Sequence, residues 1–217
     1  MIRAAIVLAA LSASTASAQY AVRYEFDIRV TSNTVTPGSG NTLEPLAVGT
    51  VGTYTIDVLN DIDVFPTDDP GFIQIYPVLD FELNIAGVVS GPRPGIYPGA
   101  FIHGVFIEND TDTNSFTQVK DNFFVNPIFD NTDFGFSVLY LAEILPFGST
   151  PTLLSGVELP LSMDVTQANY TPAFGIPASS GGRVEFAFDG VTITPIPAPA
   201  SSILLPFACL AAARRRR

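Results

Sequence analysis

The sequence predicts an all-β protein, an antiparallel two-layer β-sandwich of jelly-roll or immunoglobulin-like kind. Short runs in which apolar and polar side chains alternate recur along the chain, and clusters of Gly, Pro, Asn and Asp separate them. A helical pattern competes with this alternation at residues 133–145. There the large side chains at every second position favour a strand: Phe134, Phe136, Val138 and Tyr140. Seventeen phenylalanines and no tryptophan indicate a phenylalanine-rich core.

Residues 1–18 predict a cleaved signal peptide. Arg3 precedes an apolar run, and Ala16 and Ala18 place small side chains at the two positions that signal peptidase recognises. An N-terminal membrane anchor is the alternative, but it needs about 20 apolar residues, and hydroxyl side chains interrupt this run after Leu11. We therefore expect cleavage after Ala18.

The first two strands are predicted from alternation. At residues 20–31, six apolar side chains alternate with mostly charged ones, which indicates a strand buried on one face. A loop rich in Ser, Thr, Asn, Gly and Pro follows at 32–45. The second strand is expected at 48–59, where Gly49 and Gly52 allow a bulge or close packing.

The middle of the chain predicts four more strands. Two of them, at 72–76 and 78–89, are expected on either side of Pro77. Residues 101–108 are apolar at both alternating sets of positions, which indicates a central strand. Residues 116–125 are expected to pair with that strand as a hairpin, across a connection rich in Asn and Asp.

The remaining strands lie towards the C-terminus. Short strands are expected at 157–161 and 162–165, in a region punctuated by Pro, Gly and Thr. The last strand, at 183–194, carries its apolar side chains at even positions and then at odd positions. One extra residue near Asp189 and Gly190 must therefore be accommodated by a β-bulge.

Residues 19–195 have the length of one domain, and their charge argues against nucleic acid as a partner. Only five of the ten basic residues lie in this range, whereas all twenty-one acidic residues do. Scattered cations in such number cannot form a positive groove for phosphates. An acidic surface is instead typical of a soluble exported protein.

The residue types of common catalytic sites are scarce, so the sequence predicts a non-catalytic protein. His103 is the single histidine and Cys209 the single cysteine, which leaves Ser-His-Asp, Cys-His and zinc chemistry poorly supported. Paired carboxylates of a glycosidase are the enzymatic alternative. Exposed tyrosines could stack sugar rings, with Tyr76, Tyr97 and Tyr170 as candidates beside packing roles. No cofactor is expected apart from the calcium considered next.

A candidate calcium loop spans residues 110–121. Its ligands would be Asp110, Asp112, Asn114 and Asp121, since calcium binds several converging oxygen atoms. Ser115 stands where such loops carry Gly, and the closing acid is Asp rather than Glu. A polar hairpin connection is the alternative.

The C-terminal segment, residues 196–217, combines a Pro-Ala-Pro-Ala step, a short apolar run and a terminal arginine cluster. The residues that carry this pattern are Pro197, Pro199, Ala200, Arg214, Arg215, Arg216 and Arg217. The segment resembles the PEP-CTERM sorting signals of exported bacterial proteins, in a variant with Ala198 where the usual signal has Glu. A tail anchor is the alternative. A simple anchor has no need of the Pro-Ala-Pro-Ala step just outside the membrane, which favours the sorting signal. The apolar run at 201–213 departs from the pattern in length, because at 1.5 Å per residue it reaches only about 20 Å of a roughly 30 Å hydrocarbon layer.

This resemblance implies a route and a set of partners. They are signal peptidase, an exosortase-type transpeptidase, the inner membrane transiently, and exopolysaccharide at the cell surface or in the extracellular matrix of a biofilm. The domain is also similar to a recurrent cargo type of that family, on residues 52–57 and 186–190. Two functions stay open: an exported, non-catalytic surface or matrix protein, and a secreted carbohydrate-binding module or hydrolase.

Overall fold

A computed structural model describes residues 20–61, 72–93, 104–112, 118–170 and 173–197. Residues Tyr20–Pro197 form one compact unit. Within the described ranges the regular structure consists of nine strands and one 3₁₀ turn, η2 (Val165–Gln167), so the predicted all-β fold is confirmed. The predicted signal peptide and almost all of the predicted sorting segment lie outside these ranges.

In chain order, the strands are β1 (Tyr20–Asn33), β2 (Val51–Leu59), β3 (Ile73–Ile85), β4 (Val88–Ser90), β5 (Gly104–Asp112), β6 (Gln118–Val125), β7 (Val138–Pro146), β8 (Phe174–Pro177) and β9 (Arg183–Pro197).

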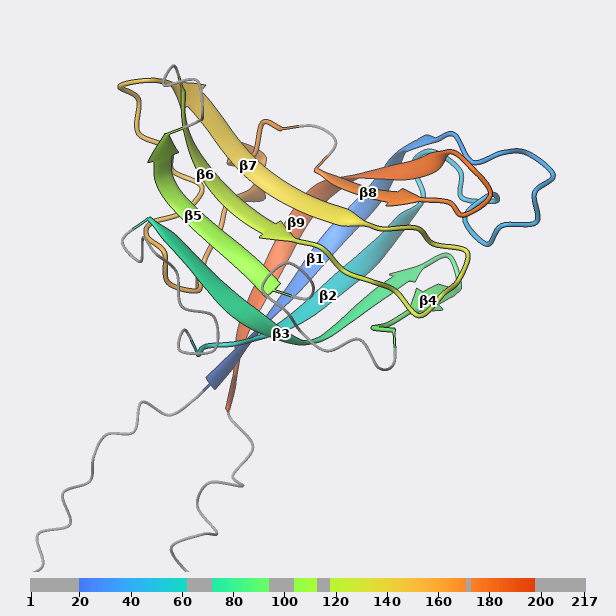
Figure 1. The fold of residues 1–217 in the computed structure, drawn as a ribbon, viewed down its shortest axis with the longest axis horizontal. Helices are drawn as coiled ribbons and strands as arrows, with labels where there is room; N and C mark the ends of the chain where they lie inside the picture. Colours follow the sequence, from blue (N-terminus) through green and yellow to red (C-terminus); the bar gives the residue numbers. More distant parts are fainter. Residues whose placement is uncertain (1–19, 62–71, 94–103, 113–117, 171–172, 198–217) are drawn as a thin grey trace, which may run out of the picture. The chain divides into compact units, whose positions relative to one another are not determined.

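All nine strands belong to one antiparallel sheet, in the order β2-β1-β9-β8-β7-β6-β5-β3-β4 (Figure 1). A further pairing joins β2 to β3, so the hydrogen-bonded pairings from β2 through to β3 form a closed circuit. The antiparallel arrangement is therefore confirmed. The division into two layers stays a prediction, because the pairings give a single continuous sheet.

β1 shows the expected alternation, and its inward side chains form the centre of the core. Tyr24 and Phe26 are fully buried, whereas the residues that alternate with them, Arg23 and Glu25, are exposed. The rings of Tyr24 and Phe123 lie 5.1 Å apart, although β1 and β6 are not neighbours in the sheet. The sheet therefore curves around a shared aromatic core.

The predicted bulge in the last strand is confirmed. Asp27 of β1 pairs with Gly190, and the next residue, Ile28, pairs with Phe188, so that Asp189 is the extra residue. β9 also continues beyond the predicted domain end at Pro195, because Ile196 and Pro197 still pair with β1.

Three further sequence predictions are confirmed. β5 and β6 pair as an antiparallel hairpin, and β7 is a strand where a helix competed, although it begins only at Val138, so that Phe134 and Phe136 lie before it. Gly52 is needed for close packing, because a Cβ atom there would lie 2.5 Å from the carbonyl oxygen of Asn84. This contact explains why only glycine fits at that point of the β2–β3 pairing.

The sequence predicted that Pro77 separates two strands, and this prediction is wrong. β3 runs through this residue and changes partner there: Ile73 to Pro77 pair with β5, and pairing with β2 begins at Val78. The strand ends instead at Ala86 and Gly87, which both have positive φ. This two-residue turn leads into β4 as a tight hairpin.

The short strands predicted at 157–161 and 162–165 are wrong. This stretch is a loop that packs on the core through Leu153, Leu154 and Leu159, and the regular structure near its end is η2. The buried carboxylate of Glu143 holds the start of the loop, because it accepts hydrogen bonds from the backbone amides of residues 152 and 153. Alternation alone could not distinguish such a loop from a strand. Conversely, β8 was not predicted.

No helix among the described residues has the length and apolar character needed to cross a membrane.

Candidate functional site

The residues of the candidate calcium loop are only partly described. Asp110 lies in β5 with a positive φ of 52°, and its backbone amide donates to Oδ1 of Asp121 at 3.0 Å. The other oxygen of Asp121 accepts from the amide of Leu154 at 2.8 Å. Burial raises the pKa of Asp121 although both amides oppose this. Asn114 and the side chain of Asp112 lie outside the described residues, so the calcium loop stays a hypothesis.

In the part of the chain that is described, no three His, Cys, Asp or Glu side chains gather as a metal-binding group. A hollow of about 290 Å³ on the outer face of β1–β3 does have several carboxylates in its lining. Asp57 there is held by Arg23, through two hydrogen bonds of 2.7 and 2.6 Å. The sugar candidate Tyr76 points into the core, where its hydroxyl donates to the carbonyl oxygen of Val157.

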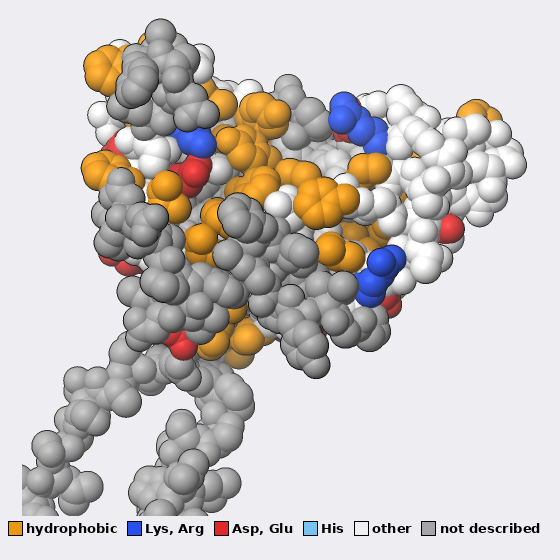
Figure 2. All heavy atoms as spheres, in the orientation of Figure 1, with side chains coloured by type: hydrophobic (Ala, Val, Ile, Leu, Met, Phe, Trp, Pro, Cys, Tyr) orange, Lys and Arg blue, Asp and Glu red, His pale blue; other side chains and the backbone are white. Residues whose placement is uncertain are grey.

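An aromatic row crosses the outer face of β5, β6 and β7. Phe106, Phe124 and Tyr140 are register partners on these three strands, and successive ring centroids lie 5.6 Å apart. Tyr170 extends the row, with its ring 4.8 Å from that of Tyr140. Figure 2 shows hydrophobic side chains gathered in a band over this face. We call these four residues the aromatic row.

The alternation of each strand directs these rings outward. The residues beside them, such as Val105, Phe123 and Leu139, are buried in the core, so the next side chain must point to the other face. Neighbouring rings in the row meet edge to face, a favourable arrangement for aromatic pairs. This packing fixes Tyr140 firmly and leaves Tyr170, which is 44% exposed, as the most accessible ring.

A polar group flanks the aromatic row. Lys120 forms an ion pair with Glu108 at 2.6 Å, and the amide nitrogen of Asn122 donates to the same carboxylate at 2.9 Å. Burial on its own lowers the pKa of Lys120, but the hydrogen bond and charge of Glu108 outweigh it, so the pKa is raised. Lys120 therefore stays charged at neutral pH.

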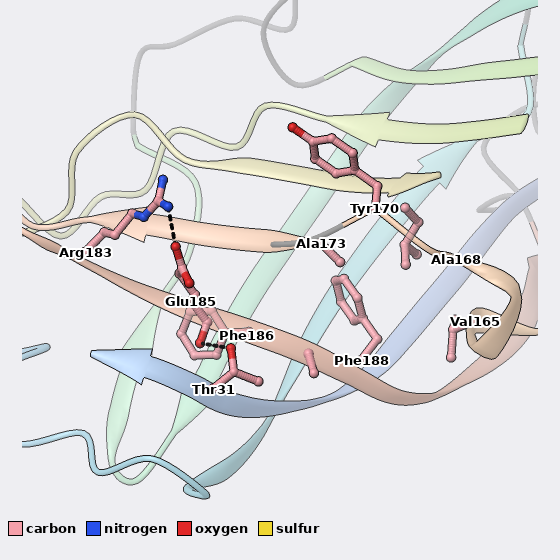
Figure 3. A pocket seen from close by; sticks show the side chains of 11 residues that line it. Thr31, Val165, Ala168, Tyr170, Ala173, Arg183, Glu185, Phe186 and Phe188 are labelled. Carbon is pink, nitrogen blue, oxygen red and sulfur yellow. Dashed lines mark hydrogen bonds and ion pairs between the residues drawn. The ribbon is translucent and has the colours of Figure 1, made fainter. Parts of the chain in front are cut away.

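Two hollows adjoin at Tyr170 and Arg183, which line both of them. The larger, of about 520 Å³, reaches the core side chains Leu141 and Phe186. Figure 3 shows Tyr170 on one side of it and Phe188, from β9, on the other.

The smaller hollow, of about 290 Å³, lies between Tyr140, Phe136 and Pro177 on the outer face of β7 and β8. Gly175 also lines it, and a Cβ atom there would come no closer than 3.9 Å to a neighbouring atom.

The larger hollow opens between β7 and β9 where β8, which is only four residues long, does not reach. β8 pairs with β7 at two positions, and beyond it β7 and β9 have no strand between them in the described chain. Asn169 bridges β7 to the loop by accepting from the amide of Ile144 at 2.9 Å and donating to its carbonyl oxygen at 2.8 Å. The next residue, Tyr170, is thereby fixed at the border of the hollows.

Arg183 and Glu185 are the charged side chains that line the larger hollow, and they form an ion pair with each other (Figure 3). Arg183 keeps further N–H donors beside this pair, because a guanidinium carries five. The site therefore offers an exposed tyrosine ring, a planar charged pair and the side-chain hydroxyl of Thr31. Such a mixture suits a ligand with both apolar faces and hydroxyl groups.

Of the residues predicted for sites, Tyr170 is the one placed at the hollows. Tyr97, His103 and the targeting residues Ala16, Ala18, Pro199, Ala200, Arg214, Arg215, Arg216 and Arg217 lie outside the described residues, and of Pro197 only the backbone is described. Sequence reasoning missed Phe106, Phe124 and Tyr140 as a group. Their outward positions follow from alternation, but their alignment depends on a pairing register that a single sequence does not reveal.

No family model matches the chain, and no curated protein or solved structure matches it either.

Proposed function

We propose that the protein is an exported, non-catalytic surface or matrix protein, which loses its signal peptide after Ala18 and is sorted by its C-terminal segment. The observation that supports the route is the pairing of the two ends of the compact unit. Tyr20 lies opposite Pro197, as the first and last residues of β1 and β9. The ends of the described sheet that lead to the two predicted export segments are therefore neighbours, and the first two residues of the predicted sorting segment, Ile196 and Pro197, belong to β9.

Mass spectrometry of the protein released by its own cells tests this proposal. The expected product begins at Gln19 and lacks Arg214–Arg217. A variant in which these four arginines are replaced by Ala should stay cell-associated and unprocessed, whereas replacement of the exposed Arg93 by Ala should leave processing unchanged. An exported product that keeps the arginine cluster and stays in the membrane would contradict sorting and favour a tail anchor.

For the fold, the proposal includes the two-layer arrangement. It is supported by ring contacts between strands that are not neighbours in the sheet. Besides the Tyr24–Phe123 contact, the rings of Tyr54 on β2 and Phe174 on β8 lie 4.9 Å apart. Such contacts are expected where two portions of a sheet face each other across a core.

Carbohydrate binding is the second candidate function. The specific observation in its favour is the accessible Tyr170 between two hollows, beside the Arg183–Glu185 pair. A hydrolase would need two converging carboxylates near a sugar-binding cleft. Around these hollows the described lining has a single carboxylate, Glu185, which is paired with Arg183. Binding without catalysis is therefore the better supported form of this candidate.

A further inference from the structure

We propose that the two hollows beside Tyr170 form a binding groove for an uncharged polysaccharide. This inference rests on the second candidate function above and assigns its site and ligand class.

The ring of Tyr170 would provide the stacking surface. It is exposed on the border of both hollows, while Tyr140 supports it from the aromatic row. The C–H faces of a sugar ring are apolar and pack well on an aromatic face. Because Tyr170 is anchored through its neighbour Asn169 and its own amide hydrogen bond to the carbonyl oxygen of Ala142, little freedom is lost on binding.

Hydroxyl groups of the same ligand would find partners at one end of the groove. Arg183 and Glu185 are planar, oppositely charged side chains, which offer donors and acceptors side by side. Their charges compensate each other locally, so the groove itself favours neither sign. The chain as a whole carries a net charge of −11, which repels an anionic polysaccharide. The one carboxylate in the described lining, Glu185, is already paired with Arg183, so the groove offers no free charge to a cationic ligand, and we assign an uncharged one.

The space favours an extended ligand. Hollows of about 520 and 290 Å³ meet at Tyr170, so successive sugar units would lie on both sides of its ring. Gly175 keeps the smaller hollow open, since its neighbours in β8, Phe174 and Ile176, point into the core. A Cβ atom added at Gly175 would not clash, because the nearest atom, the carbonyl oxygen of Val184, is 3.9 Å away.

Affinity electrophoresis tests the groove with defined probes. The released protein is run through gels containing cellulose derivatives without charge, mannan or a soluble β-glucan, with alginate as an anionic comparison. At least one uncharged polysaccharide should retard the protein, and added salt should not change the retardation.

Two variants should weaken this retardation about tenfold or more: Tyr170→Ala, which removes the stacking ring, and Gly175→Val, which fills the smaller hollow. Phe147→Ala is the matched control, because Phe147 is 65% exposed and belongs to neither hollow. It should bind as the unchanged protein does. Circular dichroism of all three variants checks that the fold is intact.

Several results would overturn the groove. They are no retardation by any uncharged probe, equal binding by Tyr170→Ala and the unchanged protein, or retardation by alginate alone that disappears in salt. A concentration-dependent dimer that Tyr170→Ala abolishes would instead make this surface an interface between copies. If cells do not release the protein, the full chain extracted in detergent is assayed in the same way. The binding assay therefore remains valid even if the export proposal is wrong.

Discussion

Two buried tyrosines of the core, Tyr24 and Tyr54, differ in whether their hydroxyl groups have a hydrogen-bond partner. The hydroxyl of Tyr24 donates to the carbonyl oxygen of Pro160 at 3.0 Å. The hydroxyl of Tyr54 is buried and has no hydrogen-bond partner within the described part of the chain, and this burial raises its pKa well above the usual value. A buried polar atom without a partner costs stability, because it has lost its hydrogen bonds with water.

We therefore expect Tyr54→Phe to raise the free energy of unfolding by about 1 kcal/mol, since it removes the unsatisfied hydroxyl and keeps the ring. Tyr24→Phe, the matched control, should lower it by about 1 kcal/mol, because it leaves the carbonyl oxygen of Pro160 without its donor. Urea denaturation followed by circular dichroism measures both. Similar losses in the two variants would show that Tyr54 does have a partner.

Glu44 gives a prediction about pH. Its carboxylate accepts from the amides of Gly38 at 2.5 Å and Gly40 at 3.0 Å, and these bonds lower its pKa. A pKa lowered in the folded state stabilises the protein above the unfolded value of about 4.3, and this contribution is lost as the pH falls through the folded value. The Glu44→Gln variant should thus be less stable at pH 7, and the difference should shrink in acid. A difference independent of pH would contradict this role.

At the scale of elements, the bulge in β9 predicts which deletion the strand tolerates. Removing Asp189 places Gly190 directly after Phe188, so the register with β1 becomes regular at this point and the inward side chains keep their face. The cost is the ion pair with Arg29, which is exposed to solvent and therefore contributes little to stability.

Deleting Thr192 is the matched comparison. Whichever way the strand adapts, either Val191 or Ile193 leaves the inner face. We therefore expect the free energy of unfolding to fall by at least about 2 kcal/mol more than it does when Asp189 is deleted. Thermal and urea unfolding measure the free energy of unfolding of both deletion variants. Equal losses would mean that the bulge does not set the alternation of β9.

Local alternation was sufficient to predict β1 and the β9 bulge, because each depends on a few residues in sequence. β8 was not predictable in this way, since its four residues are defined by their pairing with β9. Pro77 misled the prediction because a change of partner tolerates a residue without an amide donor. The aromatic row and the hollows depend on register and on the shortness of β8, which are properties of the folded sheet.

For the whole molecule, the decisive pairing joins the two ends of the compact unit. β9 pairs with β1 along its whole length and also with β8, so it is an interior strand although it is the last one made. Without it, β1 and β8 would become open edges, and the core side chains Val184 and Phe186 would be lost. Folding must therefore wait until the last strand is available. Pairings so distant in sequence also make folding slow, on the order of milliseconds to seconds.

A chain that ends after Gly182 should consequently stay unfolded, whereas a chain comprising Tyr20–Pro197, which keeps β9 and forms one compact unit, should fold. Hydrogen exchange and circular dichroism distinguish the two states. Adding a peptide of residues 183–197 to the shorter chain should restore protection in β1 and β8, its two neighbours. Protected amides in the shorter chain alone would show that the remaining strands fold without β9.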